Sequence, residues 1–121
     1  MFGRNKYIGK RELTVIIHSL ILLLLVVTLF KIPLLLTLIL LILNVSVLFL
    51  LKSKVTTLNY LGAFMFGSIS EIFAIYFGVW NYSIPSFFGI PIWLPFVWGS
   101  AGLLFCETAL FLINILEKKE I

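Results

Sequence analysis

The sequence predicts an all-α membrane protein, a bundle of four transmembrane helices with both termini in the cytoplasm. Hydrophobic residues make up 62% of the 121-residue chain, well above the roughly 45–50% that is typical of soluble domains. Four apolar runs are each about as long as a bilayer requires, and none alternates as a strand would. Cations flank these runs and form no basic stripe, so we expect no nucleic-acid partner. We expect a single membrane domain, located in the cell membrane.

The limits of the predicted spans follow from the breaks between the apolar runs. Lys31-Ile32-Pro33 separates the first two runs, with proline at a natural helix start, and Lys52-Ser53-Lys54 separates the second from the third. The first run exceeds the apolar region of a signal peptide, and no small-x-small cleavage pattern precedes Lys31, so we expect a retained helix. The predicted spans are 13–30, 34–51, 58–80 and 95–116.

Lysine and arginine lie mostly on one side of these spans. Lys31 is the single cation on the other side. The cations of the first side are Arg4, Lys6, Lys10, Arg11, Lys52, Lys54, Lys118 and Lys119. Because all the loops are short, the positive-inside rule places this side, and both termini with it, in the cytoplasm.

The connection over residues 81–94, NYSIPSFFGIPIWL, carries no charge. It is too apolar for an ordinary solvated loop, and its prolines oppose a continuous helix. Irregular backbone is tolerated at membrane depth only where protein or a cavity covers it. We therefore expect this connection to lie in the outer interface or to fold back over the bundle.

Glu71 and Glu107 are the acidic residues inside the predicted spans, where placing an ionisable group in hydrocarbon costs free energy. Counted at 1.5 Å per residue from the span ends, both lie near the middle of the membrane, on helices that a short connection makes neighbours. No lysine or arginine inside a predicted span offsets them, and an ionised side chain there costs about 2.5–3.5 kcal/mol. We expect the two carboxyl groups to share one level, to retain at least one proton, and to be catalytic. The alternative is a neutral pair, hydrogen-bonded to each other, to Asn44 or to backbone.

Helical phase indicates that both glutamates face inward. The small residues near Glu71 would let another helix approach closely. The stripe around Glu71 is Tyr60, Phe64, Gly67, Ser68, Ala74, Ile75 and Gly78. The stripe around Glu107 is Ser100, Leu103, Leu104, Leu110, Phe111 and Asn114.

Other polar and aromatic residues could complete this centre. Asn44 suits a packing hydrogen bond as well as a ligand contact, and His18 suits a structural role better. Trp80 and Trp98 each lie nine residues from a glutamate, so they point away from it and are typical of interface anchors. The residues expected to line a ligand are Asn44, Ser68, Tyr82, Trp93, Ser100 and Asn114.

The chain lacks the residues that several common enzyme mechanisms require. The chain has no aspartate for Mg²⁺-diphosphate chemistry, and it has neither a G-x-S-x-G motif nor a second histidine besides His18 for a serine hydrolase. Cys106 stands alone, so it forms no internal disulfide and no metal-ligand cluster. We expect no metal and no cofactor.

Residues 71–95 resemble membrane proteins of carotenoid biosynthesis. Glu71 is followed by Gly78-Val79-Trp80-Asn81-Tyr82, Gly89-Ile90-Pro91 and Leu94-Pro95. Small lycopene-cyclase-domain proteins and the carotenoid hydratase group pair an intramembrane acid with a G-x-W-x-Y/F element and a G-x-P or L-P turn. The resemblance implies acid–base chemistry on an isoprenoid, with one glutamate as the acid and the other as base or stabiliser. Where the cyclase pattern has two glutamates, this chain has Phe96-Val97.

Two other functions fit the same residues. The protein could be a small proton-coupled transporter or cation-binding dimer, or a non-catalytic membrane subunit or assembly factor. The expected ligand is a membrane lipid or an apolar isoprenoid. Because four helices bury little interior, we also expect a homo-oligomer or a partner membrane subunit.

Overall fold

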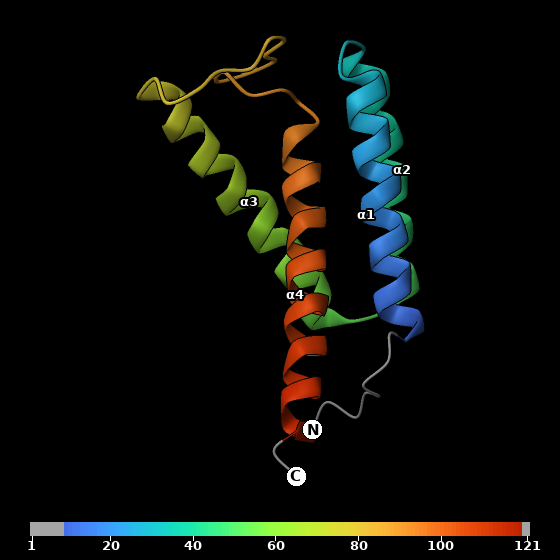
Figure 1. Ribbon diagram of the computed structural model, residues 1–121. Coiled ribbons are helices and arrows are strands. Elements are labelled where there is room, and N and C mark those ends of the chain that lie inside the picture. Colours follow the sequence, from blue (N-terminus) through green and yellow to red (C-terminus); the bar gives the residue numbers. More distant parts are fainter. Residues whose placement is uncertain (1–8, 120–121) are drawn as a thin grey trace.

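The computed structural model describes residues 9–119, which form four helices and no named strand. They are α1 (Lys10–Leu29), α2 (Pro33–Leu51), α3 (Lys54–Tyr76) and α4 (Leu94–Lys119), and they alternate in direction along the bundle (Figure 1). All four are long and apolar enough to cross a membrane. The predicted fold class, an all-α bundle of four membrane-spanning helices, is confirmed.

Helix α4 is central to the bundle, because it packs against each of the other three helices and most extensively against α3. Helix α3 leans away from α1 and α2 toward its own end, and the connection over 77–93 crosses back to the start of α4 (Figure 1). The loop end is here the end of the bundle that carries this connection and the turn between α1 and α2. The far end is the opposite one.

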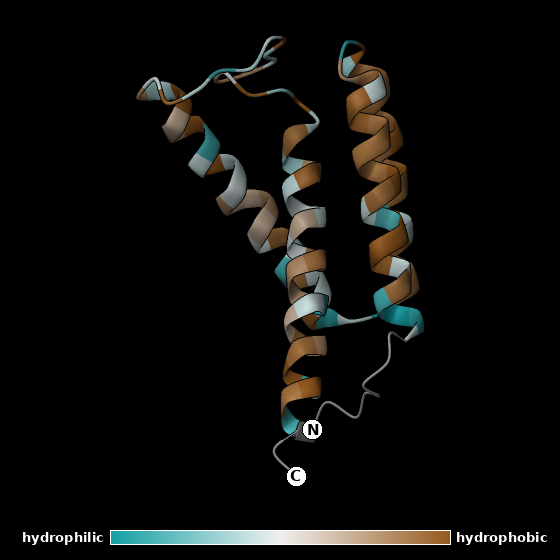
Figure 2. Cartoon of the chain, viewed as in Figure 1, coloured by the Kyte–Doolittle hydropathy of each residue, from teal (hydrophilic) through white to brown (hydrophobic). Residues whose placement is uncertain are grey.

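The outer surface of the bundle is apolar, as expected for helices that face lipid. Figure 2 shows hydrophobic residues over most of α1 and α2, with hydrophilic residues where α1 begins and between α2 and α3. Large apolar side chains such as Leu34 and Phe49 are each 75% exposed. Such a surface would be costly in water but not in hydrocarbon.

The predicted third span ends four residues too late. Helix α3 ends at Tyr76, and Gly78 follows it with a φ of 78°. The Gly78 amide donates to the Ile75 carbonyl and the Val79 amide to the Ala74 carbonyl, the pair of bonds that closes a helix on a left-handed residue. Trp80 therefore belongs to the connection and does not follow helical rotation.

The connection packs onto the loop end of the bundle, as the sequence predicts. Phe87 and Ile90 exchange backbone hydrogen bonds of 2.9 and 3.1 Å, which fold residues 87–90 into a tight turn. Ile90 and Trp93 are buried against the helices. The core cluster at this end consists of Leu22, Leu36, Leu40, Ile90, Trp93 and Leu94. A second cluster, nearer the far end, consists of Val15, Val47, Leu51, Tyr60 and Leu103.

Helices α3 and α4 approach closely where Gly67 receives the ring of Trp98. A methyl group built on Gly67 would overlap that ring, whereas one built on Gly62 would meet nothing within 4 Å. The predicted role of Gly67 in close helix packing is thus confirmed.

We expect Gly67→Ala to destabilise the bundle by about 1–3 kcal/mol, because Trp98 must shift to admit the methyl group. Gly62→Ala is the matched control and should stabilise by about 0.5–1 kcal/mol through backbone entropy alone. Unfolding free energies from dodecyl sulfate titration, followed by circular dichroism, give both values. Equal effects of the two substitutions would contradict the close packing at Gly67.

Candidate functional site

At the far end, Arg11 joins all four helices. It lies on α1, and its Nε donates to Oε1 of Glu107 on α4 at 2.8 Å. Its other two nitrogens donate to the carbonyl of Leu51, the last residue of α2, at 2.9 Å, and to the hydroxyl of Thr56 on α3. The Glu107 side chain is only 3% exposed. We call Arg11, Leu51, Thr56 and Glu107 the arginine clasp.

The arginine clasp corrects two expectations about Glu107. Its partner Arg11 lies in the first turn of α1, and the other acceptors of Arg11 lie at the end of α2 and in the first turn of α3. Glu107 is therefore level with the ends of three helices and not with their middles, since α4 continues to Lys119 beyond them. A cation also offsets its charge, because α1 begins at Lys10 and includes Arg11. Distances counted along one apolar run cannot detect such an offset between helices.

Halfway along the bundle, a chain of buried hydrogen bonds again reaches all four helices. His18 Nε2 lies 3.1 Å from the Ser100 hydroxyl, which donates to Asn44 Oδ1 at 3.0 Å. The Asn44 amide nitrogen donates to the Tyr60 hydroxyl at 2.6 Å and to the Phe96 carbonyl at 3.1 Å. We call this set the central polar chain. Because its members satisfy one another, it accounts for Asn44, Ser100 and His18 without any ligand.

Ser68 and Asn114, also predicted to line a ligand, lie at different levels. The Ser68 hydroxyl donates to the Phe64 carbonyl of its own helix at 2.6 Å. Asn114 is buried on α4, two turns beyond Glu107. The residues expected to line one site are thus distributed over the whole length of the bundle.

Near the loop end, Glu71 is held by aromatic side chains. The Trp80 indole donates to its Oε2 at 2.8 Å, and the Trp98 indole donates to its Oε1 at 3.3 Å. Burial, the negative charge of Glu71 and a hydrogen bond to it raise the pKa of Tyr82 to about 12. Tyr82 therefore keeps its proton at any physiological pH. We call Glu71, Trp80, Tyr82 and Trp98 the aromatic carboxylate cluster.

This cluster overturns the expected pairing of the two glutamates. Trp98 touches Glu71, and Trp98 and Glu107 are nine residues apart on α4, which is roughly 13 Å of helix. The carboxyl groups therefore do not share one level. The expectation that Trp80 points away from Glu71 is also wrong, whereas Trp98, expected to point away from Glu107, contacts Glu71 instead. Trp80 follows the end of α3, and Trp98, although nine residues from Glu107, reaches Glu71 on the neighbouring helix.

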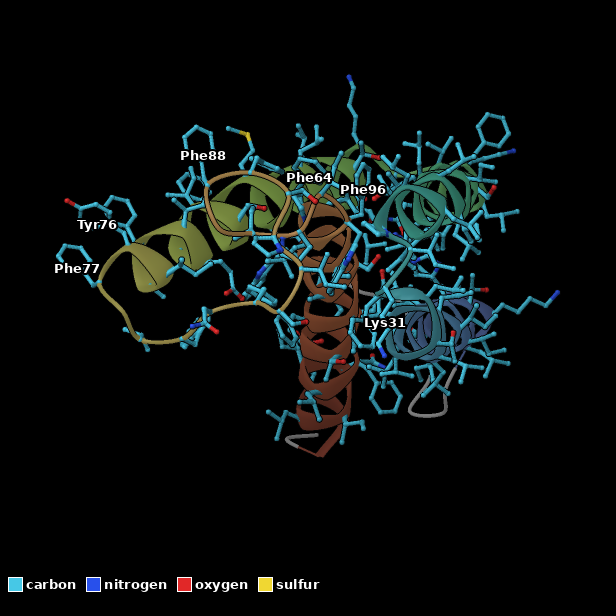
Figure 3. All side chains as sticks on the ribbon, turned by 90° about the horizontal axis from the view of Figure 1, so that it is seen from above. Lys31, Phe64, Tyr76, Phe77, Phe88 and Phe96 are labelled. Atoms are coloured by element: carbon cyan, nitrogen blue, oxygen red, sulfur yellow. The ribbon has the colours of Figure 1, made fainter. Side chains whose placement is uncertain are left out.

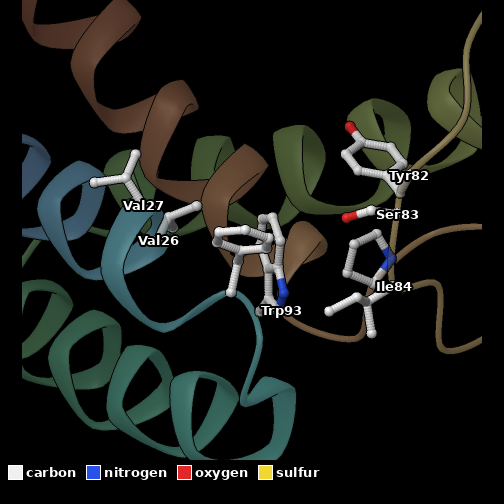
Figure 4. Close-up of a pocket in the computed structure, with 8 residues that line it drawn as sticks. Val26, Val27, Tyr82, Ser83, Ile84 and Trp93 are labelled. Carbon is white, nitrogen blue, oxygen red and sulfur yellow. The ribbon is translucent and has the colours of Figure 1, made fainter.

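A pocket of about 230 Å³ lies beside the cluster, between the end of α1 and the connection. Figure 4 shows its walls around Trp93. Its lining residues are Val26, Val27, Phe30, Tyr82, Ser83, Ile84, Pro91 and Trp93. Tyr82 and Trp93, which the sequence predicts to line a ligand, both line this pocket, and Tyr82 also belongs to the aromatic carboxylate cluster.

Aromatic packing separates this region from the rest of the bundle. Phe64 of α3 and Phe96 of α4 meet edge to face, with ring centroids 5.3 Å apart. Seen from above in Figure 3, Tyr76 and Phe77 project outward at the end of α3. Across residues 9–119, no His, Cys, Asp or Glu group of three or more could hold a metal ion.

Comparison with protein-family models, with curated proteins and with solved structures finds no match for this chain.

Sequence reasoning missed Arg11, Thr56, Trp80 and Trp98 as polar partners. A usable signal exists only for Trp98, since Gly67 lies one turn before Glu71 and opens a gap there that a large side chain can fill. The other contacts depend on how far one helix is shifted along another, and no spacing within a single helix encodes that shift.

We expect Arg11→Leu to destabilise the protein by about 3–5 kcal/mol, because it leaves the buried Glu107 carboxylate without its cation. Arg11→Leu combined with Glu107→Leu should recover most of that loss. Lys10→Leu, which removes an exposed charge next to Arg11, should change stability by less than about 0.5 kcal/mol. A double-mutant cycle of unfolding free energies measures the coupling, and additive losses would contradict the ion pair.

The central polar chain predicts a second loss of stability. Asn44→Leu leaves the Tyr60 and Ser100 hydroxyls without their buried partner, so we expect it to destabilise by about 1–3 kcal/mol. Ser46→Ala removes an exposed hydroxyl that bonds only within α2 and should change stability by less than about 0.5 kcal/mol. The same unfolding titration compares the two variants. Equal values would mean that Asn44 does not tie the helices together.

Proposed function

We propose that this chain is an isoprenoid-modifying enzyme of the cell membrane, with both termini in the cytoplasm, in which Glu71 exchanges a proton with an unsaturated chain. The observation that carries the proposal is the aromatic carboxylate cluster. It supplies a buried carboxyl group whose hydrogen-bond partners, among the described residues, are all aromatic side chains and include no cation.

The geometry of Glu71 suits proton exchange. A carboxylate has about four acceptor positions, and the indoles of Trp80 and Trp98 occupy two of them. In the proposal a remaining position takes the proton or faces the reacting carbon. Glu71 is 8% exposed, so little water can compete for the proton or quench a cationic intermediate.

The surroundings of Glu71 would also stabilise positive charge. Protonation of an alkene creates a carbocation, and the faces of aromatic rings attract cations. One carboxyl group can complete the reaction. It gives its proton to one carbon of the double bond, and as a carboxylate it takes a proton from a carbon next to the cation. Such a cycle isomerises or cyclises the chain without any oxidant, reductant or cofactor.

In this proposal Glu107 has a structural role and does not act as the second catalytic carboxylate. Protonating it would remove the charge that Arg11 faces in the arginine clasp. The proposal therefore keeps the acid–base chemistry implied by the resemblance but assigns both proton-transfer steps to Glu71.

Incubation in D₂O tests the proposal directly. The protein, reconstituted in liposomes, is offered farnesol, geranylgeraniol, squalene and lycopene, and the recovered lipids are analysed by mass spectrometry for deuterium bound to carbon. We expect incorporation by the wild type with at least one of them. Glu71→Gln should reduce it by about 100-fold or more, the usual contribution of a general acid.

The matched control is Glu117→Gln, which removes an exposed carboxyl group from the end of α4 and should leave incorporation unchanged. Glu107→Gln should lower the yield of folded protein but not the incorporation per folded molecule. Wild-type protein that labels none of the four probes, or Glu71→Gln that labels as well as wild type, would contradict the proposal.

A further inference from the structure

We infer that the pocket at the loop end binds the end of an isoprenoid chain that carries an oxygen, and that Trp93 donates a hydrogen bond to this oxygen. The isoprenoid class rests on the proposed function. The requirement for an oxygen rests on Trp93 itself, and it narrows the substrate from any polyene to an oxygenated one.

The indole nitrogen of Trp93 is a buried donor without a partner. Trp93 is 7% exposed, and its Nε1 has no hydrogen-bond acceptor among the described residues and almost no exposure to water. An indole N–H can only donate, and a buried donor left unpaired is destabilising. The indoles of Trp80 and Trp98 both have a carboxylate acceptor. Trp93 is therefore the exception among the three tryptophans.

The unpaired donor faces the pocket. In Figure 4 the nitrogen of Trp93 lies on the side of its ring that faces Ser83 and Ile84, which line the opposite wall. Residues 77–93, which carry that wall, form no helix. Within this segment Ser83 and Ile84 make no backbone hydrogen bond to another described residue, so an entering ligand would part this wall and bring an acceptor to the nitrogen.

The pocket admits only part of a long ligand. Its volume of about 230 Å³ is below the roughly 300–1,000 Å³ of typical small-molecule sites. Most of its lining is aliphatic or aromatic, which favours a hydrocarbon chain with one polar group at the buried end. Tyr82 is shared between the pocket and the aromatic carboxylate cluster, so a chain anchored at Trp93 would have a nearby double bond beside Glu71.

A pair of matched probes tests the oxygen. Farnesol and farnesene have closely related branched chains, but only farnesol carries a hydroxyl. Binding of each to delipidated wild-type protein and to Trp93→Phe is titrated by native mass spectrometry. For each variant the ratio of the farnesol affinity to the farnesene affinity is measured. We expect this ratio to be about 3- to 10-fold higher in the wild type than in Trp93→Phe, which corresponds to the free energy of one hydrogen bond. Comparing this ratio between variants cancels the different solubilities of the probes.

Two further variants locate the effect. Phe88→Leu changes an exposed residue of the same connection and should keep the wild-type ratio. Val27→Trp fills the pocket and should weaken the binding of both probes about tenfold or more. The inference is overturned if Trp93→Phe keeps the wild-type ratio, if Phe88→Leu lowers the ratio as much, or if Val27→Trp binds both probes normally.

A phospholipid could supply an acceptor through its ester carbonyls, so dioleoyl phosphatidylglycerol is included as a competitor. If it displaces farnesol from wild type but not from Trp93→Phe, the pocket holds an acyl lipid and the isoprenoid class is wrong. The deuterium label reports on Glu71, and the ratio of farnesol to farnesene binding reports on Trp93. Failure of the proton chemistry at Glu71 and failure of the oxygen contact at Trp93 therefore give different results.

Discussion

The geometry of this bundle depends on the pairing of polar groups that are buried among apolar helices. Lipid tails are as apolar as leucine, so helices in a bilayer gain little from hydrophobic association. Leucine-rich helices such as α1 and α2 could slide along their neighbours at little cost. Two sets of contacts oppose such sliding, and each reaches all four helices: the arginine clasp and the central polar chain. Together they fix the relative heights of the helices at two levels.

The candidate site benefits from this constraint without taking part in it. Helix α4 supplies Glu107 to the arginine clasp and Ser100 to the central polar chain, so its height is fixed by both. Two residues before Ser100, Trp98 fits against Gly67 and donates to Glu71. The position of the Glu71 carboxyl group at the loop end therefore follows from contacts closer to the far end. Trp80 and Tyr82 add a second constraint from the connection.

The sequence contains most of the fold but only part of the site. Apolar runs and their breaks predict four helices, because within hydrocarbon the backbone N–H and C=O groups of an isolated apolar run can form their hydrogen bonds only in a helix. Helical phase predicts that Glu71, Ser100 and Glu107 are buried, because phase depends on one helix alone. The height of Glu107 and the partners of Glu71 depend on how helices are offset and on where Gly78 ends α3. Two glutamates that residue counting places at the middle of their own spans can therefore lie at different levels of the bundle.

The two glutamates have different surroundings although their side chains are identical. Arg11 faces Glu107 with a full positive charge at 2.8 Å. Around Glu71 the donors are two neutral indoles, and the neutral phenol of Tyr82 interacts with the same carboxyl group. Among residues 9–119, no cation donates a hydrogen bond to Glu71. Tyr82 connects the two parts of the loop end, because it interacts with Glu71 and, together with Trp93, lines the pocket there.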